Sequence, residues 1–309
     1  MGTHIYGKKT VSVIIPTLNA ERELPTILNN LHNQNYPIEE VTIIDSSSTD
    51  HTVDICKNDD LVHLIQIRQK DFDHGRTRDM ALRSSVGDIV VFLTQDAIPA
   101  NDRFIQNLIN PLLNNEAIIS TGKQIPKQEA TKIEQLIRAF NYPEESCIKS
   151  KKDIADMGIK TFFCSNVCAA YERNAYLKLG GFEYPLKTNE DMFFAAYAIR
   201  NGYKVAYAAD AVVYHSHNLT LRQQFKRNYM QGYEIERHKN LIGNVKIKSE
   251  GIQLVKYVSK MLIMGGNIIS FAYFIIDSFT RIMGHNIGKI SYIKGKFLNH
   301  EYKKYSNCM

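Results

Sequence analysis

The chain has 309 residues, 44% of them hydrophobic and 23% charged, which is enough for a full hydrophobic core and excludes a disordered protein. Its net charge of +6 is unevenly spread, because residues 219–309 hold 15 Lys and Arg against 5 Asp and Glu, whereas residues 1–218 hold 23 against 27. Five scattered cysteines, with no secretory apolar segment after Met1, exclude a disulfide framework and predict a reducing, cytoplasmic setting.

The first third of the chain alternates apolar strands with helical patterns. Pro16 should end the first strand, and Asn19 is a good N-cap for the helix that follows. Further helices are expected from about Thr52 and over residues 77–85. This alternation predicts a parallel sheet covered by helices. Its strands are expected at residues 11–15, 41–45, 61–65 and 89–93.

The segments that follow these strands carry polar side chains without a nucleotide-binding glycine motif. Neither G-x-G-x-x-G nor G-x-x-x-x-G-K-[ST] occurs, so dinucleotide cofactors and P-loop chemistry are disfavoured. Asp45 ends the second strand and is followed by a hydroxyl-rich loop. A carboxylate there can accept hydrogen bonds from a base or a ribose, or it can simply cap the next helix.

A basic loop and an acidic strand end come next. In residues 71–79, Gly75 lets the backbone approach a ligand, and Arg76 and Arg78 suit phosphate oxygens, although arginines exposed to solvent are an equal possibility. Asp96 follows the strand 89–93, and open α/β sheets bind ligands at that edge, although a single Asp after a strand is more often a cap or turn residue. A basic loop facing an acidic strand end indicates a site for a metal diphosphate.

The middle of the chain is less regular. A helix reaching Leu112 and a strand at residues 117–122 precede residues 126–160, which we expect to be a mobile insertion on the acceptor side with a helix at residues 133–140. The apolar run 162–170 is expected as another strand. It leads into a short helix that ends before two adjacent glycines.

Asn189 is expected to cap a helix whose first turn holds Glu190 and Asp191, and carboxylates in a first turn are also explained by the helix dipole alone. Two short strands, residues 204–207 and 211–214, should then lead into a His-Ser-His sequence. Histidines at positions i and i+2 of a strand share one face, which suits either metal coordination or simple exposure.

Residues 219–309 form a second, basic region beside a first domain of residues 1–218. An amphipathic helix is expected from Leu221. Residues 261–276 are uncharged but are shorter than the roughly 20 residues that cross a bilayer. We expect an interfacial or partner-packing helix pair, with a buried hairpin as the alternative. Long apolar runs interrupt the basic residues, which argues against nucleic-acid binding.

The order of these motifs along residues 10–230 resembles the inverting family-two nucleotide-sugar glycosyltransferases, which have the GT-A fold. Residues 72–78 together with residues 94–97 are most similar to bacterial rhamnosyltransferases, which use dTDP-L-rhamnose. The resemblance implies an α/β fold with a Rossmann-like mixed sheet, covered by helices and followed by a C-terminal helical extension.

The resemblance also implies roles for individual residues. Asp191 would be the catalytic base, with Glu190 orienting groups near it. Asp96 and His215, or His217 in place of His215, would hold Mg²⁺ or Mn²⁺. Donor binding would fall to the remaining residues, which are Thr17, Asn19, Asp45, Ser47, Asp50, His74, Gly75, Arg78 and Gln95. Gln95 stands where many members of the family carry another Asp.

The function implied is transfer of L-rhamnose from dTDP-L-rhamnose to a lipid-linked or polysaccharide acceptor of the bacterial cell envelope. The basic tail would then bind the anionic inner face of the plasma membrane, or form a homodimer. Two alternatives are a nucleotidyltransferase and a non-catalytic, membrane-associated scaffold. A nucleotidyltransferase calls for a glycine-rich basic loop after the first strand, and residues 16–19 are not such a loop.

Overall fold

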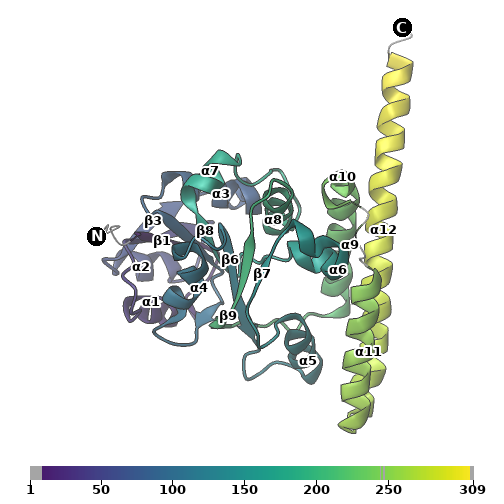
Figure 1. Ribbon diagram of the computed structural model, residues 1–309, viewed down its shortest axis with the longest axis horizontal. Coiled ribbons are helices and arrows are strands. Elements are labelled where there is room, and N and C mark those ends of the chain that lie inside the picture. The colour runs from purple at the N-terminus through teal and green to yellow at the C-terminus, as the bar shows by residue number, and fades with distance from the viewer. Residues whose placement is uncertain (1–8, 244, 246–247, 307–309) are drawn as a thin grey trace.

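The computed structural model describes residues 9–306 except residues 244, 246 and 247, so that Cys308 lies outside the described part. Within that part, nine strands form one sheet surrounded by helices (Figure 1). The strands are β1 (Val11–Thr17), β2 (Glu40–Asp45), β3 (Val62–Gln66), β4 (Ile89–Leu93), β5 (Ile98–Pro99), β6 (Ile119–Ile125), β7 (Cys147–Lys149), β8 (Cys168–Glu172) and β9 (Val205–Tyr214).

The sheet is parallel in its first half and mixed in its second. Its order is β3-β2-β1-β4-β8-β6-β9-β5, with β7 paired to β9. Strands β3, β2, β1 and β4 are parallel, as expected, whereas β8 runs antiparallel to both β4 and β6. Because Thr17 of β1 lies beside Asp45 of β2, the polar residues that follow these strands reach the same edge of the sheet.

Helices cover both faces of the sheet. Alternate residues of β1 point to opposite faces: Val13 and Ile15 pack with α1 and α4, whereas Ile14 packs with α3 and α8. The helices are α1 (Leu24–His32), α2 (Thr52–Lys57), α3 (His74–Ser84), α4 (Phe104–Leu113), α5 (Lys132–Asn141), α6 (Ile154–Met157), α7 (Arg173–Lys178), α8 (Glu190–Arg200), α9 (Leu221–Arg237), α10 (Lys239–Ile242), α11 (Lys248–Met264) and α12 (Ile268–Ser306).

Two local predictions near the first strand were wrong. β1 does not stop at Pro16, because its pairing with β4 ends at Ile14 while its pairing with β2 continues to Thr17. A residue without an N–H is tolerated where one side of the strand is open. Asn19 does not cap α1, which begins at Leu24; it adopts a left-handed conformation with φ 52° and holds a neighbouring loop instead.

Four predictions in the second half also need correction. The expected strands at residues 204–207 and 211–214 are one strand, β9, and only the end of the run 162–170 is a strand, β8. Asn189 precedes α8 as expected, but its side chain makes no cap hydrogen bond. Residues 126–160, expected as a mobile insertion, contain α5, β7 and α6, and they are tied to the rest by β7–β9 pairing and by packing of α5 on α11.

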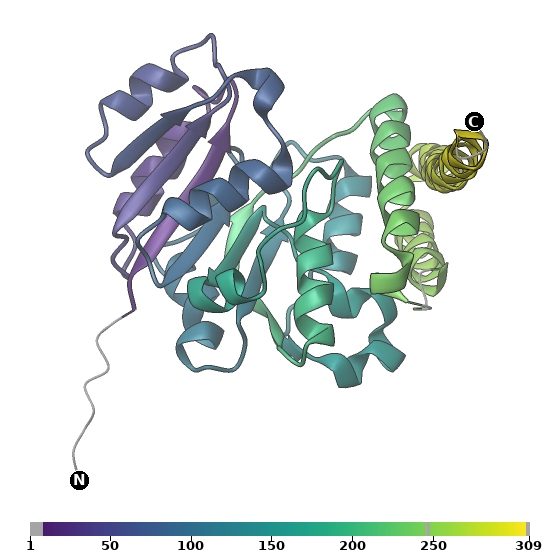
Figure 2. The same cartoon turned by 90° about the horizontal axis from the view of Figure 1, so that it is seen from above.

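The two C-terminal helices form a hairpin, and the second of them makes a long contact with α9. α11 and α12 are joined by a turn at Gly265 and Gly266, and α12 packs along α9, which separates it from the sheet (Figure 2). None of the described helices is long and apolar enough to cross a membrane. The expected division at residue 218 falls between β9 and α9, and it stays a prediction.

Glycine permits the close approach of α9 and α12. A Cβ at Gly232 of α9 would lie 2.1 Å from the carbonyl oxygen of His285, and one at Gly288 of α12 would lie 2.0 Å from that of Tyr229. The two backbones are therefore in direct contact, which no other residue at these positions would allow without a shift of the helices.

Candidate functional site

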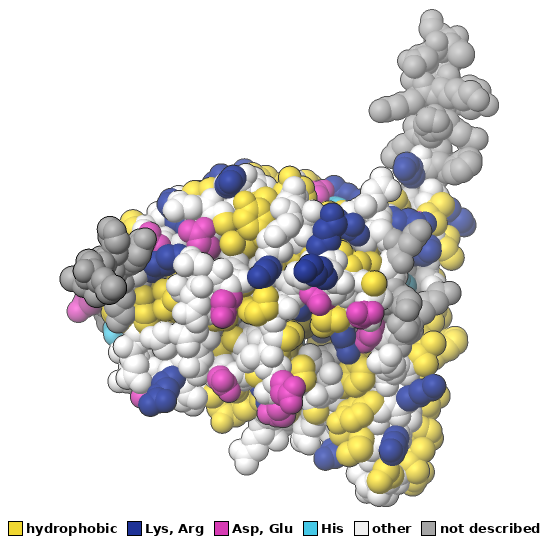
Figure 3. Space-filling model, viewed as in Figure 1, with side chains coloured by type: hydrophobic (Ala, Val, Ile, Leu, Met, Phe, Trp, Pro, Cys, Tyr) yellow, Lys and Arg dark blue, Asp and Glu magenta, His cyan; other side chains and the backbone are white. Residues whose placement is uncertain are grey.

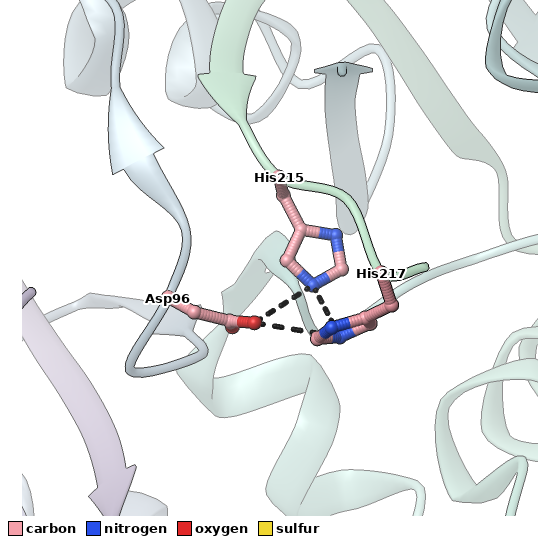
Figure 4. Close-up of side chains that lie close together, drawn as sticks. All are labelled: Asp96, His215 and His217. Atoms are coloured by element: carbon pink, nitrogen blue, oxygen red, sulfur yellow. Dashed lines mark hydrogen bonds and ion pairs between the residues drawn. The ribbon is translucent and has the colours of Figure 1, made fainter. Parts of the chain in front are cut away.

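Three side chains from two segments converge at one edge of the sheet (Figure 4). Asp96 follows β4, whereas His215 and His217 follow β9. Asp96 Oδ2 lies 3.5 Å from His215 Nε2 and 3.4 Å from His217 Nε2, and the two Nε2 atoms are 3.1 Å apart. The structure thus brings Asp96 and His215 together. His217, which was predicted only as an alternative to His215, lies next to both.

Burial and charge act against each other in this cluster. Burial raises the pKa of the Asp96 carboxyl, but His215 and His217, which hold positive charge beside it when they are protonated, outweigh burial and bring that pKa below its usual range. Burial lowers the pKa of both His215 and His217. Near pH 7 the carboxylate is therefore ionised and the imidazoles are neutral, which is the form that binds metal.

The three ligand atoms fit one cation. An ion held at about 2.1 Å by ligands at right angles leaves about 3.0 Å between them, and wider angles leave somewhat more. The observed separations of 3.1, 3.4 and 3.5 Å lie in that range. Without a cation, the two Nε2 atoms, 3.1 Å apart, would need a hydrogen on one of them to form a hydrogen bond with each other.

A second group of charged side chains lies at the start of α8. Glu190 is buried and forms an ion pair with Arg78 of α3, with Nη1 and Oε1 3.0 Å apart. Asn166 also donates its side-chain N–H to Glu190 over 3.2 Å. Two side-chain partners therefore fix the Glu190 carboxylate, whereas its neighbour Asp191 forms no ion pair with any of the described residues.

Asp191 is held by backbone and perturbed by its surroundings. The backbone N–H groups of Asn166 and Met192 donate to it over 2.9 and 2.7 Å. Burial, followed by the negative charge of Glu190, raises the pKa of the Asp191 carboxyl to about 7, despite these hydrogen bonds and the nearby Arg78. A carboxyl of this pKa can accept a proton near neutral pH.

The residues expected at the nucleoside form their own cluster at the ends of β1 and β2. Asp45 is fully buried and accepts hydrogen bonds from both the backbone N–H and the hydroxyl of Ser48. Thr17 donates to it over 3.5 Å. Asn19 and Ser47 both have positive φ, and the Asn19 side chain accepts from the N–H of Thr49 over 2.8 Å. These residues shape one tight pair of loops.

Asp50 has a structural position in the same loops. Its carboxylate accepts from the N–H of Glu21 over 3.1 Å and from the N–H of Thr52 over 3.0 Å, so it joins the loop after β1 to the start of α2. Burial raises its pKa, but the hydrogen bonds from Thr52 and Glu21 together outweigh burial and lower the pKa. These contacts hold the loop after β1 and the loop before α2 together.

The basic loop of the sequence is in fact the beginning of a helix. His74 and Gly75 lie in the first turn of α3, which Asp73 caps by accepting the N–H of Arg76 over 2.8 Å. A Cβ at Gly75 would lie 2.7 Å from the carbonyl oxygen of Glu183, so glycine here allows close packing. Burial, and then the charge of Arg78, lowers the pKa of His74.

Gln95 links the loop after β1 to Asp96, its neighbour in the chain. Its side-chain oxygen accepts from the N–H of Leu18 over 2.7 Å, and its side-chain nitrogen donates to the carbonyl of the same residue over 3.1 Å. Both ends of the amide are thereby engaged with the loop after β1, next to Asp96 in the chain.

A pocket of about 710 Å³ extends from the side chains of Asp96, His215 and His217 to the start of α8. Of the predicted site residues, those on its wall are His74, Arg78, Asp96, Glu190, Asp191 and His215. The wall also includes residues that the sequence did not predict at the site, because they lie on β6, α5 and α9 or just before β8 without a recognisable motif. These are Gln124, Arg138, Asn166, Gln223, Lys226, Arg227 and Met230.

Comparison with known proteins identifies the family. The model for glycosyl transferase family 2 matches residues 12–180. The chain is 41% identical to the O-antigen chain rhamnosyltransferase RfbN of Salmonella typhimurium, over 72% of this chain and 71% of that protein. It is also 41% identical to the O-antigen chain rhamnosyltransferase WbaN of Salmonella anatum, over 72% of this chain and 70% of that one.

A solved structure confirms the fold. A mannosyltransferase from Pyrobaculum calidifontis, in complex with GDP-Man and Mn²⁺, superimposes with a TM-score of 0.63 at 17% identity, covering 93% of this chain and 88% of that one. The prediction of a GT-A fold with a C-terminal helical extension is thus confirmed, and glycosyl transfer is favoured over the nucleotidyltransferase and scaffold alternatives. The chain belongs to glycosyl transferase family 2 and is a glycosyltransferase.

Proposed function

We propose that the protein transfers a sugar from a nucleotide donor to an acceptor hydroxyl with inversion at the sugar carbon, and that Asp191 is the base. The observation that carries this proposal is the carboxyl of Asp191, whose pKa is raised to about 7 and which shares one pocket with the cluster of Asp96, His215 and His217. A base on one wall and an anion-stabilising group on another suit a single displacement.

In the proposed transfer reaction, Asp191 and the three clustered side chains have different roles. Asp191 accepts the proton of the acceptor hydroxyl while the acceptor oxygen forms a bond to the sugar carbon. The bond from that carbon to the phosphate oxygen breaks, and its electron pair leaves with the nucleoside diphosphate. Asp96, His215 and His217 would hold Mg²⁺ or Mn²⁺, which neutralises developing charge on the diphosphate when bound.

Arg78 would share in this stabilisation. Its Nη1 is engaged with Glu190, but its buried Nε has no hydrogen-bond partner among the described residues. A buried N–H of a charged group without a partner is costly, so an incoming anionic oxygen at this atom would satisfy it. Glu190 in turn would keep the guanidinium in place.

The donor we propose is dTDP-L-rhamnose. Support comes from the names of the two relatives at 41% identity, both of which are O-antigen chain rhamnosyltransferases. Thr17, Asn19 and Asp45 would bind the nucleoside at the ends of β1 and β2, with His74 and Gly75 beside the donor. The remaining loop residues, Ser47, Asp50 and Gln95, would hold these groups in place.

A donor screen tests the proposal. The purified chain is incubated with Mn²⁺ and one of several nucleotide sugars, and release of the nucleoside diphosphate is measured. We expect the fastest release from dTDP-L-rhamnose. Release from another nucleotide sugar, with none from dTDP-L-rhamnose, would overturn the donor while leaving glycosyl transfer intact. The acceptor proposed is a lipid-linked or polysaccharide glycan of the cell envelope.

We further propose that the enzyme works at the inner face of the plasma membrane. Exposed apolar side chains lie along α11 and along the side of α12 opposite its contact with α9, and we name this surface the apolar face; Figure 3 shows hydrophobic side chains over this hairpin, interspersed with Lys and Arg. Its residues are Met261, Ile263, Met264, Ile268, Ile269, Tyr273, Ile275, Ile276, Phe279, Ile282, Met283, Ile287, Ile290 and Ile293.

The charges around the apolar face favour an anionic lipid surface over a second copy of the chain. Residues 251–296 contain six Lys and Arg but a single carboxylate, Asp277, which is buried and paired with Arg281 at 2.6 Å. Within residues 251–296 of a second copy, exposed Lys256, Lys260 and Lys294 would therefore find no unpaired carboxylate, whereas lipid phosphates would pair with them. Glu250, at the start of α11, is already paired with Lys160 at 2.7 Å.

Flotation with vesicles tests this surface. The wild type should float with vesicles that contain phosphatidylglycerol and less with neutral phosphatidylcholine vesicles. The double variant Ile276→Glu and Phe279→Glu should not float, whereas Val86→Glu, at an exposed apolar residue elsewhere on the body, should behave as the wild type. A wild-type dimer that ignores vesicles and that the double variant dissociates would show a homodimer interface instead.

A further inference from the structure

Gln124 lies directly behind the cluster of Asp96, His215 and His217. It belongs to β6 and is 1% exposed. The register of β6 against β9 shifts between Gly122 and Lys123, and such irregularities commonly re-aim side chains next to active sites. Nothing in the local sequence marks this residue, since its position depends on where the shift occurs.

The amide of Gln124 is fixed in one orientation. Nη1 of Arg138 lies against Oε1 of Gln124, and a guanidinium can only donate, so the atom facing it must be the amide oxygen. The amide nitrogen then faces the hydroxyl of Ser165 and donates to it over 3.1 Å. Arg138 is itself held by Glu134 on α5, with Nε and Oε1 2.7 Å apart.

That orientation determines which nitrogen of His215 carries hydrogen. Oε1 of Gln124 lies 3.0 Å from Nδ1 of His215, and because a carbonyl oxygen only accepts, Nδ1 must be protonated. In the neutral ring, Nε2 is then the unprotonated nitrogen, and it is this atom that faces Asp96 and His217. A metal ligand needs that lone pair.

We propose that Gln124, with Arg138 behind it, is a positioning residue that locks His215 in the tautomer needed to bind a divalent cation. The inference rests on the proposed metal site. Partners of this kind typically change metal affinity by 10- to 100-fold when they are removed.

Two variants of Gln124 separate the hydrogen bond from the space that the side chain fills. Gln124→Leu removes the acceptor, and we expect Mn²⁺ affinity, measured by the electron paramagnetic resonance of free Mn²⁺, to fall 10- to 100-fold. Gln124→Glu keeps an oxygen that accepts from His215 and pairs with Arg138, so it should retain wild-type affinity or better. Gln135→Leu, on α5 with its side chain on a backbone carbonyl, is the control and should bind as the wild type.

A measurement on the wild type keeps the test independent of folding and of the metal. Nitrogen-15 shifts of the His215 ring, recorded without metal at pH 7.5, should show hydrogen on Nδ1 in the wild type. Hydrogen on Nε2, or unchanged Mn²⁺ affinity in a folded Gln124→Leu, would overturn the inference. Failure of the wild type to bind any divalent cation would instead overturn the metal site, while the tautomer would still be decided by the shifts.

Discussion

The ionisation of Asp191 controls the rate if this residue is the base, and its environment sets the pH at which that occurs. Burial and the charge of Glu190 raise its pKa to about 7. Only the ionised form accepts a proton, so transfer should rise with pH. A pKa of about 7 leaves about one tenth of the carboxyl ionised at pH 6 and about nine tenths at pH 8, which predicts a roughly tenfold rise in rate between them.

The cause of this shift can be tested through Glu190. Replacing Glu190 with Gln removes the negative charge that raises the pKa of Asp191 and leaves Arg78, which lowers it, without its partner. Both effects favour the ionised form, so the midpoint of the pH profile should move below that of the wild type. An unchanged midpoint would show that burial alone sets the pKa.

The assay is single-turnover transfer to an acceptor between pH 5.5 and 9, with donor and metal in excess. Asp191→Asn should reduce transfer by about 10²- to 10⁴-fold at every pH while it still binds donor. Asp210→Asn, an exposed carboxylate away from the pocket, is the control and should keep the wild-type profile. Full turnover in a folded Asp191→Asn would refute the assignment of the base.

Two further predictions concern the metal and the C-terminal helices. Chelation with EDTA should abolish transfer, and Mn²⁺ should restore it better than Mg²⁺, because two of the three cluster ligands are imidazoles; equal recovery with Mg²⁺ would contradict this. In urea unfolding, Gly288→Ala should cost about 1–3 kcal/mol, since the new Cβ would lie 2.0 Å from the carbonyl oxygen of Tyr229. Gly295→Ala on the same helix, with no atom within 4 Å of its Cβ, should instead stabilise by about 1 kcal/mol, and similar effects of the two changes would refute the packing argument.

Much of the first half of the fold could be predicted because its signals are local. The strands around residues 41–45 and 89–93 are continuous apolar runs, and the helices between them repeat with helical spacing, so neither depends on distant parts of the chain. The error at Pro16 arose because a proline ends a strand only where both edges are paired, and pairing is decided by the tertiary structure.

The site could be predicted only in part for the same reason. Asp96, Asp191 and His215 follow or begin regular elements, where a polar residue after an apolar run is visible in the sequence. Gln124 and Arg138 are visible only after β6, β9 and α5 are assembled, because a shifted register and a helix packed across the strand bring them to His215. His217 could be proposed from the sequence. That both histidines contact the same carboxylate could be seen only in the structure, because it depends on the path of the chain after β9.

The backbone contact between α9 and α12 has a consequence for how substrates reach the pocket. One side of α9 carries Lys226, Arg227 and Met230 on the pocket wall, while the other side meets α12 through Gly232. Where Gly232 and Gly288 bring the two backbones into contact, no side chain separates them, so α9 cannot move toward α12 at this point without displacing it. If α9 moves to widen the pocket on that side, the α11–α12 hairpin must move with it. A membrane or protein that binds the hairpin would therefore also limit how far the pocket can open.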